Sequence, residues 1–280
     1  MVDYHGRFVW YELTTTDVEA AKTFYADVVG WGAQDASTPD LAYTLFTVRG
    51  VPISGLMGLT EDAKKAGARP RWTGYVGVND VDASTDRISQ LGGTVLIPPT
   101  DIPNVSRFSV VTDPQMAALA LVRWYNRGSE KPGTPGEPGR VGWHELFAGD
   151  WEKAFAFYRE AFSWQKADAD NGPMGAYQLF SVGGQTVGGM FTKPLEVPVP
   201  FWLYYFEVGD IDAGAGRVKA GGGRILEDPL EVPGGWIVRC IDPQDAMFAL
   251  MGKRSRKAVG YFVRNAPRDP SDPRSRRWNW

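Results

Sequence analysis

The chain of 280 residues has little cysteine and little histidine: one Cys, Cys240, and two His, His5 and His144. A single cysteine cannot form an internal disulfide, so the composition is typical of the reducing cytoplasm. With so few His and Cys, any metal site would be built mostly from carboxylates. The sequence also lacks an apolar run of about 20 residues and a secretory signal, so we expect neither a membrane protein nor a secreted one.

What is present suits a folded protein with two cores. Hydrophobic residues make up 43% and aromatic residues 13% of the chain. Charge is uneven: residues 253–280 carry nine Lys or Arg against two Asp, a net +7, while the remainder carries −10. The acidic body disfavours a nucleic-acid partner. The basic tail is either an extension without a docking role or an arm that docks on its own body or on a second subunit of a homo-oligomer.

The chain contains an internal repeat. Residues 6–13 match residues 139–146 at an offset of 133, with Trp-x-Glu-Leu in both copies. The same offset aligns Gly55 with Gly188 and Met57 with Met190. A repeat this long indicates two whole domains. We therefore expect a domain at 1–125, a Pro/Gly-rich linker at 126–138, a second domain at 139–252 and a basic tail at 253–280.

Each copy alternates strands and helices. Apolar residues follow helical spacing after Asp17 and again after Asp80, and strand-like runs fill most of the rest. Two helices and about eight strands per domain predict an α+β class.

The ordered motifs resemble the vicinal oxygen chelate superfamily, which includes glyoxalase I, bleomycin-resistance proteins and extradiol dioxygenases. The resemblance is carried by Trp-x-Glu-Leu, a following Asp and Phe-Tyr, Asp80-Val81-Asp82, and Asp113-Pro114-Gln115, which recurs as Asp242-Pro243-Gln244. It implies that each domain is a pair of βαβββ units forming an open eight-stranded barrel. Members of the superfamily usually have Gly two residues after the Pro of this motif. Met116 and Asp245 occupy that position in this sequence. We therefore expect the first turn to differ in type, because Met adopts a positive φ poorly.

The resemblance also implies a divalent metal held by His and Glu or Gln inside the barrel. Three of the family's ligand positions correspond in each domain to Trp10, Thr73 and Ala120, and to Trp143, Leu203 and Ala249. A fourth position lies near Met57 and Met190. None of these side chains is a good ligand for a hard cation, so we expect no metal and no cofactor.

Strand alternation predicts which side chains face the barrel interior instead. The candidate ligand-binding residues are Trp10, Glu12, Thr73, Tyr75, Trp143, Glu145, Tyr205 and Glu207. Aromatic residues on strands are also commonly core residues. An inward Glu could equally accept hydrogen bonds from Arg107, Tyr75 or a backbone N–H, or serve as an acid–base group. His144 aligns with Tyr11, which favours packing or hydrogen bonding over metal ligation, and Cys240 fits a small buried residue.

Three functions remain open. The first is binding of a small aromatic or hydrophobic molecule in the barrels without the usual metal. The second is an enzyme, namely a lyase, isomerase or dioxygenase with a non-standard site, for which Glu12 and Glu145 are the candidate catalytic residues. The third is an interaction protein that acts through its basic tail.

Overall fold

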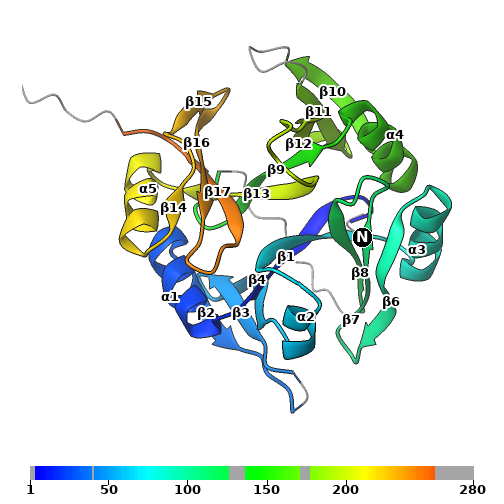
Figure 1. The fold of residues 1–280 in the computed structure, drawn as a ribbon, viewed down its shortest axis with the longest axis horizontal. Helices are drawn as coiled ribbons and strands as arrows, with labels where there is room; N and C mark the ends of the chain where they lie inside the picture. The colour runs from blue at the N-terminus through cyan, green and yellow to red at the C-terminus, as the bar shows by residue number, and fades with distance from the viewer. Residues whose placement is uncertain (1–3, 40, 126–135, 171–176, 256–280) are drawn as a thin grey trace, which may run out of the picture.

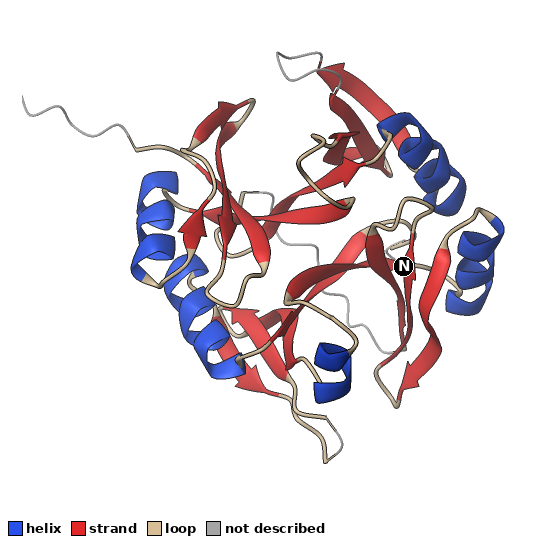
Figure 2. Cartoon of the chain, viewed as in Figure 1, coloured by secondary structure: helices blue, strands red, loops and turns tan. Residues whose placement is uncertain are grey.

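The computed structural model describes residues 4–39, 41–125, 136–170 and 177–255. Most of the predicted linker and nearly all of the basic tail lie outside this part of the chain. Strands form the bulk of the molecule and helices lie at its flanks, as Figure 2 shows. The first half consists of β1 (Phe8–Thr15), α1 (Val18–Val29), β2 (Gly32–Asp35), β3 (Thr44–Val48), β4 (Val51–Gly58), α2 (Glu61–Lys65), β5 (Arg71–Gly77), α3 (Val81–Gln90), β6 (Thr94–Ile102), β7 (Ser106–Thr112) and β8 (Ala118–Trp124).

The second half repeats this order. Its elements are β9 (Val141–Ala148), α4 (Trp151–Phe162), β10 (Gln165–Asp170), β11 (Tyr177–Val182), β12 (Gln185–Thr192), β13 (Phe201–Val208), α5 (Ile211–Ala220), β14 (Arg224–Ile225), β15 (Leu230–Val232), β16 (Gly235–Ile241) and β17 (Met247–Gly252). Helices α1, α3, α4 and α5 all begin after an aspartate whose side chain accepts a hydrogen bond from a backbone N–H of the first turn. This recurring N-cap satisfies a free donor and fixes where each helix starts.

Each half forms one continuous sheet. The first has eight strands in the order β2-β3-β4-β1-β5-β8-β7-β6, and the second has nine, because β15 also pairs with β16. The expected α+β fold of two glyoxalase-like domains is confirmed, as open sheets that do not close into barrels. The ninth strand arises because the segment equivalent to β6 is interrupted at Asp228 and Pro229, which separates β14 from β15.

One predicted alignment is wrong. Gly55 lies opposite Glu12, whereas Gly189, not Gly188, lies opposite Glu145. The second copy has one extra residue before β12, so the offset that aligns β4 with β12 is 134 and not 133. An error of one residue in such an alignment assigns each side chain to the wrong face of its strand. Met190 is accordingly buried in the main core.

The prediction for the Asp-Pro-Gln turns is also wrong. Met116 has φ 78° and Asp245 has φ 74°, so both turns take the same left-handed conformation. In the first turn, Asp113 Oδ1 accepts hydrogen bonds from the backbone N–H groups of Gln115 and Ala117 at 2.8 and 2.9 Å. These bonds hold the turn, and with it a conformation that Met adopts poorly.

The two domains share one hydrophobic core on the side of the sheets that carries the helices. Helix α1 contacts α5 and α3 contacts α4, which places the pairs at opposite flanks of the molecule (Figure 1). Equivalent residues exchange hydrogen bonds across this interface: Tyr25 donates to Asp242 at 3.1 Å, and Tyr158 donates to Asp113 at 3.0 Å. The packing is therefore self-complementary, like that of a twofold dimer.

The opposite side of each sheet is called its open face here. Each open face has a small separate cluster, which includes Tyr75, Val110, Ala120 and Val122 in the first domain and Phe147, Leu203, Tyr205 and Ala249 in the second. No helix in the described part of the chain has both the length and the hydropathy needed to cross a lipid bilayer.

Candidate functional site

Strand register places the predicted residues of the first domain together on its open face. Trp10 of β1 lies opposite Tyr75 of β5, and Glu12 lies opposite Thr73. Tyr75 in turn lies beside Ala120 of β8. Because side chains alternate along a strand, all five share one face, and Tyr11 and Leu13 take the other.

Two tyrosines hold the Glu12 carboxylate. The Tyr43 hydroxyl donates to Oε2 at 2.9 Å and the Tyr75 hydroxyl donates to Oε1 at 3.0 Å. Burial raises the pKa of Glu12 above its ordinary value, and these two hydrogen bonds oppose the rise. The Trp10 indole N–H also donates to the Tyr43 hydroxyl, at 3.4 Å. Two tyrosine hydroxyls therefore hold the Glu12 carboxylate, and the Trp10 indole in turn holds Tyr43.

Tyr43 reaches Glu12 because the residue between them is Gly55. A Cβ at this position would collide with the Tyr43 hydroxyl. In the second domain, a Cβ at Gly189 would collide with the ring of Tyr177. The sequence interpretation missed both tyrosines, although each precedes its glycine by 12 residues.

The second domain keeps this plan and adds a cation. Tyr205 donates to Glu145 Oε2 at 2.6 Å, and Arg239 Nη2 donates to the same oxygen at 3.0 Å. The side chains of this ion pair are only 14% and 5% exposed for Arg239 and Glu145. The Trp143 indole donates to the Tyr177 hydroxyl at 2.9 Å. The negative charge of Glu145 is thus balanced by Arg239, whereas Glu12 has no such ion pair among the described residues.

Arg239 is held from several sides. Its Nη1 donates to Glu227 at 2.8 Å, and its guanidinium lies 5.2 Å from the centre of the Phe147 ring. The equivalent position in the first domain is Val110, because Val110 and Arg239 lie opposite Ala120 and Ala249, respectively. Comparison of the two repeats could not predict a residue that only one of them has.

The structure also shows the surroundings of three other residues that the sequence analysis discussed. Arg107 does not approach Glu12: it donates to Asp82 at 2.7 Å and forms an ion pair with Asp101. The Tyr11 hydroxyl and His144 Nε2 lie 2.6 Å apart, in the shared core. Burial lowers the pKa of His144 to about 4, so its ring is neutral at pH 7. Cys240 is buried, and burial raises the pKa of its thiol to about 12.

The side chains at the family's metal-ligand positions do not fit a metal ion. Trp10 and Ala120 lie in one row across the first sheet with Tyr75 between them, and Thr73 lies opposite Glu12. In the second sheet, Trp143 and Ala249 flank Tyr205, and Leu203 lies opposite Glu145. Within the described residues, no group of three or more His, Cys, Asp or Glu side chains is placed to hold a metal. In these rows Trp10 and Trp143 are partly exposed, whereas Tyr75 and Tyr205 are 9% and 1% exposed and both alanines are buried.

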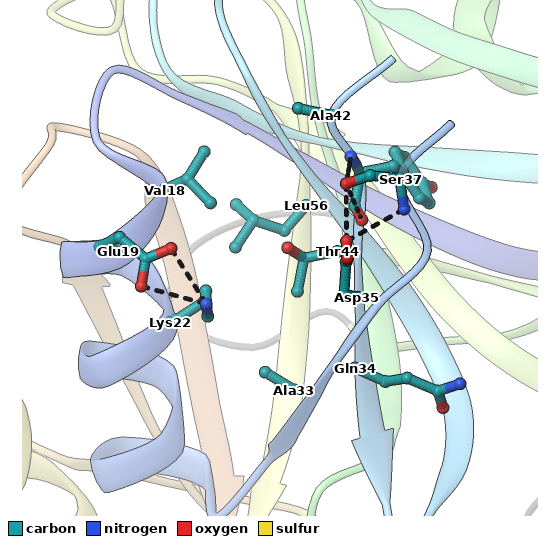
Figure 3. A pocket seen from close by; sticks show the side chains of 11 residues that line it. Val18, Glu19, Lys22, Ala33, Gln34, Asp35, Ser37, Ala42, Thr44 and Leu56 are labelled. Carbon is teal, nitrogen blue, oxygen red and sulfur yellow. Dashed lines mark hydrogen bonds and ion pairs between the residues drawn. The ribbon is translucent and has the colours of Figure 1, made fainter. Parts of the chain in front are cut away.

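A pocket of about 380 Å³ lies between α1 and the β2–β3 region, and Tyr43 is among the residues that line it (Figure 3). Its charged groups are satisfied locally: Lys22 pairs with Glu19 at 3.0 Å, and Asp35 accepts from the Ser37 hydroxyl at 2.6 Å.

Comparison with known proteins identifies the family. The model of the Glyoxalase/Bleomycin resistance protein/Dioxygenase superfamily matches residues 7–121 and 140–249. The chain belongs to this superfamily. Two matches of one family model in one chain agree with the tandem fold.

Relatives of this superfamily match along most of the chain. A Mycobacterium tuberculosis protein named "Putative glyoxylase CFP32" is 32% identical over 245 residues, covering 86% of this chain and 93% of its own. The anthracycline biosynthesis protein DnrV of Streptomyces peucetius is 31% identical over 264 residues, covering 89% of this chain and 94% of its own.

Solved structures share the fold at low identity. The Mn(II)-bound glyoxalase from Novosphingobium aromaticivorans has a TM-score of 0.63 at 14% identity, over 91% of this chain and 84% of its own. The 2,3-dioxygenase LapB from Pseudomonas sp. KL28 has a TM-score of 0.59 at 11% identity, over 89% of this chain and 92% of its own.

Proposed function

We propose that each open face binds a small planar aromatic molecule without the metal ion that the superfamily commonly uses. The observation that carries the proposal is the Trp–Tyr–Ala row beside a tyrosine-bound carboxylate, present in both domains. Trp10 and Trp143 offer stacking area, and Glu12 and Glu145 offer acceptors that fix orientation. Thr73 lies beside this row in the first domain.

The relatives support an aromatic ligand. Two of them are named anthracycline biosynthesis proteins, from Streptomyces sp. and Streptomyces peucetius, and both match along most of the chain. Anthracyclines are fused planar ring systems, which suit the partly exposed Trp side chains described above. Such a molecule would lie against Trp10 in one domain and against Trp143 in the other.

Acridine, a planar molecule that is neutral at about pH 8, is a suitable probe. We expect saturable changes in acridine fluorescence on titration with the full chain, unchanged after extended dialysis against EDTA. Trp10→Ala and Trp143→Ala should each weaken binding in their own domain by about fivefold, since an aromatic stack is worth about 1 kcal/mol. The absence of saturable binding to folded protein would contradict the proposal. So would binding that EDTA abolishes and Mn(II) restores.

An enzymatic role is the second candidate, and Glu12 favours it. A buried carboxylate with a raised pKa is a suitable proton acceptor for an isomerase. Glu12→Gln separates the two functions: a binding protein keeps its acridine affinity and never shows turnover, whereas an enzyme keeps affinity and loses turnover. A role for the basic tail concerns residues that lie mostly outside the described structure.

A further inference from the structure

One carboxylate on the open face of the second domain is left unused by the network around Glu145. Glu207 follows Leu203 and Tyr205 at alternate positions of β13, so it shares their face, and it lies opposite Met251 of β17. The residue is 8% exposed. Its carboxylate has no hydrogen-bond or ion-pair partner among the described residues, and burial alone raises its pKa.

The two domains differ at a pair of equivalent positions, and this difference makes room for the Glu207 carboxylate. In the first domain, the equivalent residues are Val9 of β1 and Gly77 of β5, and a Cβ at Gly77 would lie 2.7 Å from the Tyr4 backbone oxygen and 3.3 Å from the Val9 side chain. In the second domain, the β9 position is Gly142 and the facing residue is Glu207. A Cβ at Gly142 would collide with the Glu207 carboxylate and lie 2.6 Å from Met251 Sδ. The same space therefore holds a valine in one domain and a carboxylate in the other.

Three arginines on neighbouring elements are paired with other carboxylates. Arg239 pairs with Glu145 and Glu227. Arg254 donates to Asp212 at 2.7 Å and lies 4.3 Å from the centre of the Trp236 ring. Arg140 pairs with Glu137 at 3.3 Å. A largely buried carboxylate without a partner is costly, and a bound cation would offset that cost.

We propose that the second domain selects a planar aromatic molecule that carries a protonated amine, with Glu207 as its counter-charge, whereas the first domain takes a neutral one. This rests on the proposed binding function. Glu207 lies four residues along β13 from Leu203, which faces Glu145. Four strand residues span roughly 13 Å. A ring system stacked on the partly exposed Trp143 would lie between the amine site and the Glu145–Arg239 pair.

The test compares acridine with 9-aminoacridine, which is protonated at about pH 8, in fluorescence titrations of the full chain. We expect the wild type to bind 9-aminoacridine about tenfold more tightly than acridine, as for a hydrogen bond to a charged group. Glu207→Gln should remove this preference, so that the two dyes bind with similar affinity. Glu207→Ala is the second variant, in case the amide perturbs folding. Glu231→Gln makes the same charge change at an exposed position of β15 and should keep the preference.

Other outcomes overturn the inference. A preference for the cation that survives Glu207→Gln and Glu207→Ala, or that Glu231→Gln reduces equally, would show general attraction by the acidic body. Either result would leave the proposed binding function standing. Failure of the wild type to bind either dye would contradict both.

Discussion

Glu12 and Glu145 occupy the same place in the two halves of the molecule, and their surroundings differ in charge. Both accept a hydrogen bond from a β-strand tyrosine, Tyr75 or Tyr205. Only Glu145 has a buried cation, because Arg239 stands where the first domain has Val110. Among the described residues, the first open face therefore holds its acid with two tyrosine hydroxyls, whereas the second pairs its acid with Arg239 and adds the unpaired Glu207. Duplication preserved the fold while each copy acquired its own electrostatics.

The largest predicted effect comes from removing the cation of the second domain. Arg239→Met should lower the free energy of unfolding by about 3 kcal/mol, because it leaves Glu145 buried without its ion-pair partner. The double variant Glu145→Gln/Arg239→Met should recover most of this loss, since no buried charge is left. Urea unfolding monitored by circular dichroism measures both. A double variant as unstable as the single one would mean that Arg239 acts through packing on Phe147 instead.

The next effect concerns the glycines that admit Tyr43 and Tyr177. Gly55→Ala should lower the free energy of unfolding by about 2 kcal/mol, because it displaces Tyr43, one of the two tyrosines that donate to Glu12. Gly189→Ala should cost about 1 kcal/mol, since Glu145 keeps both Tyr205 and Arg239. Thermal unfolding of the two variants beside wild type gives the comparison. Equal losses would show that the steric clash alone matters and that the carboxylates are equally well held.

Much of this arrangement could be predicted from the sequence. The repeat and the alternation of strand residues are local properties, so they placed Trp10, Glu12 and Tyr75 on one face. They also predicted the α+β fold and its two domains.

The missing parts depend on contacts between segments. Tyr43 precedes its strand and reaches Glu12 across Gly55, a contact that strand periodicity does not describe. Arg239 has no counterpart in the first repeat, although a lone arginine in the apolar run Ile-Val-Arg-Cys-Ile was an available signal. Met116 adopts a positive φ because hydrogen bonds to Asp113 hold the turn, which residue preference alone does not reveal.

The smallest predicted effect is a pH dependence specific to the first domain. Burial raises the pKa of Glu12 in the folded protein above its value in the unfolded chain. Folding therefore favours the protonated acid, and this contribution to stability is lost as the pH rises through the folded-state pKa. Glutamine does not titrate. The free energy of unfolding of Glu12→Gln, relative to wild type, should accordingly increase between about pH 4 and about pH 8.

Two further variants show whether this trend belongs to Glu12. Glu145→Gln should be less stable than wild type at pH 8, because Arg239 loses its buried partner. Glu231→Gln, at an exposed position of β15, should follow wild type throughout. Denaturant unfolding at a series of pH values gives all three curves. A Glu12→Gln curve parallel to that of wild type would mean that Tyr43 and Tyr75 stabilise the Glu12 carboxylate enough to cancel the cost of burying it, and the two domains would then treat their acids alike.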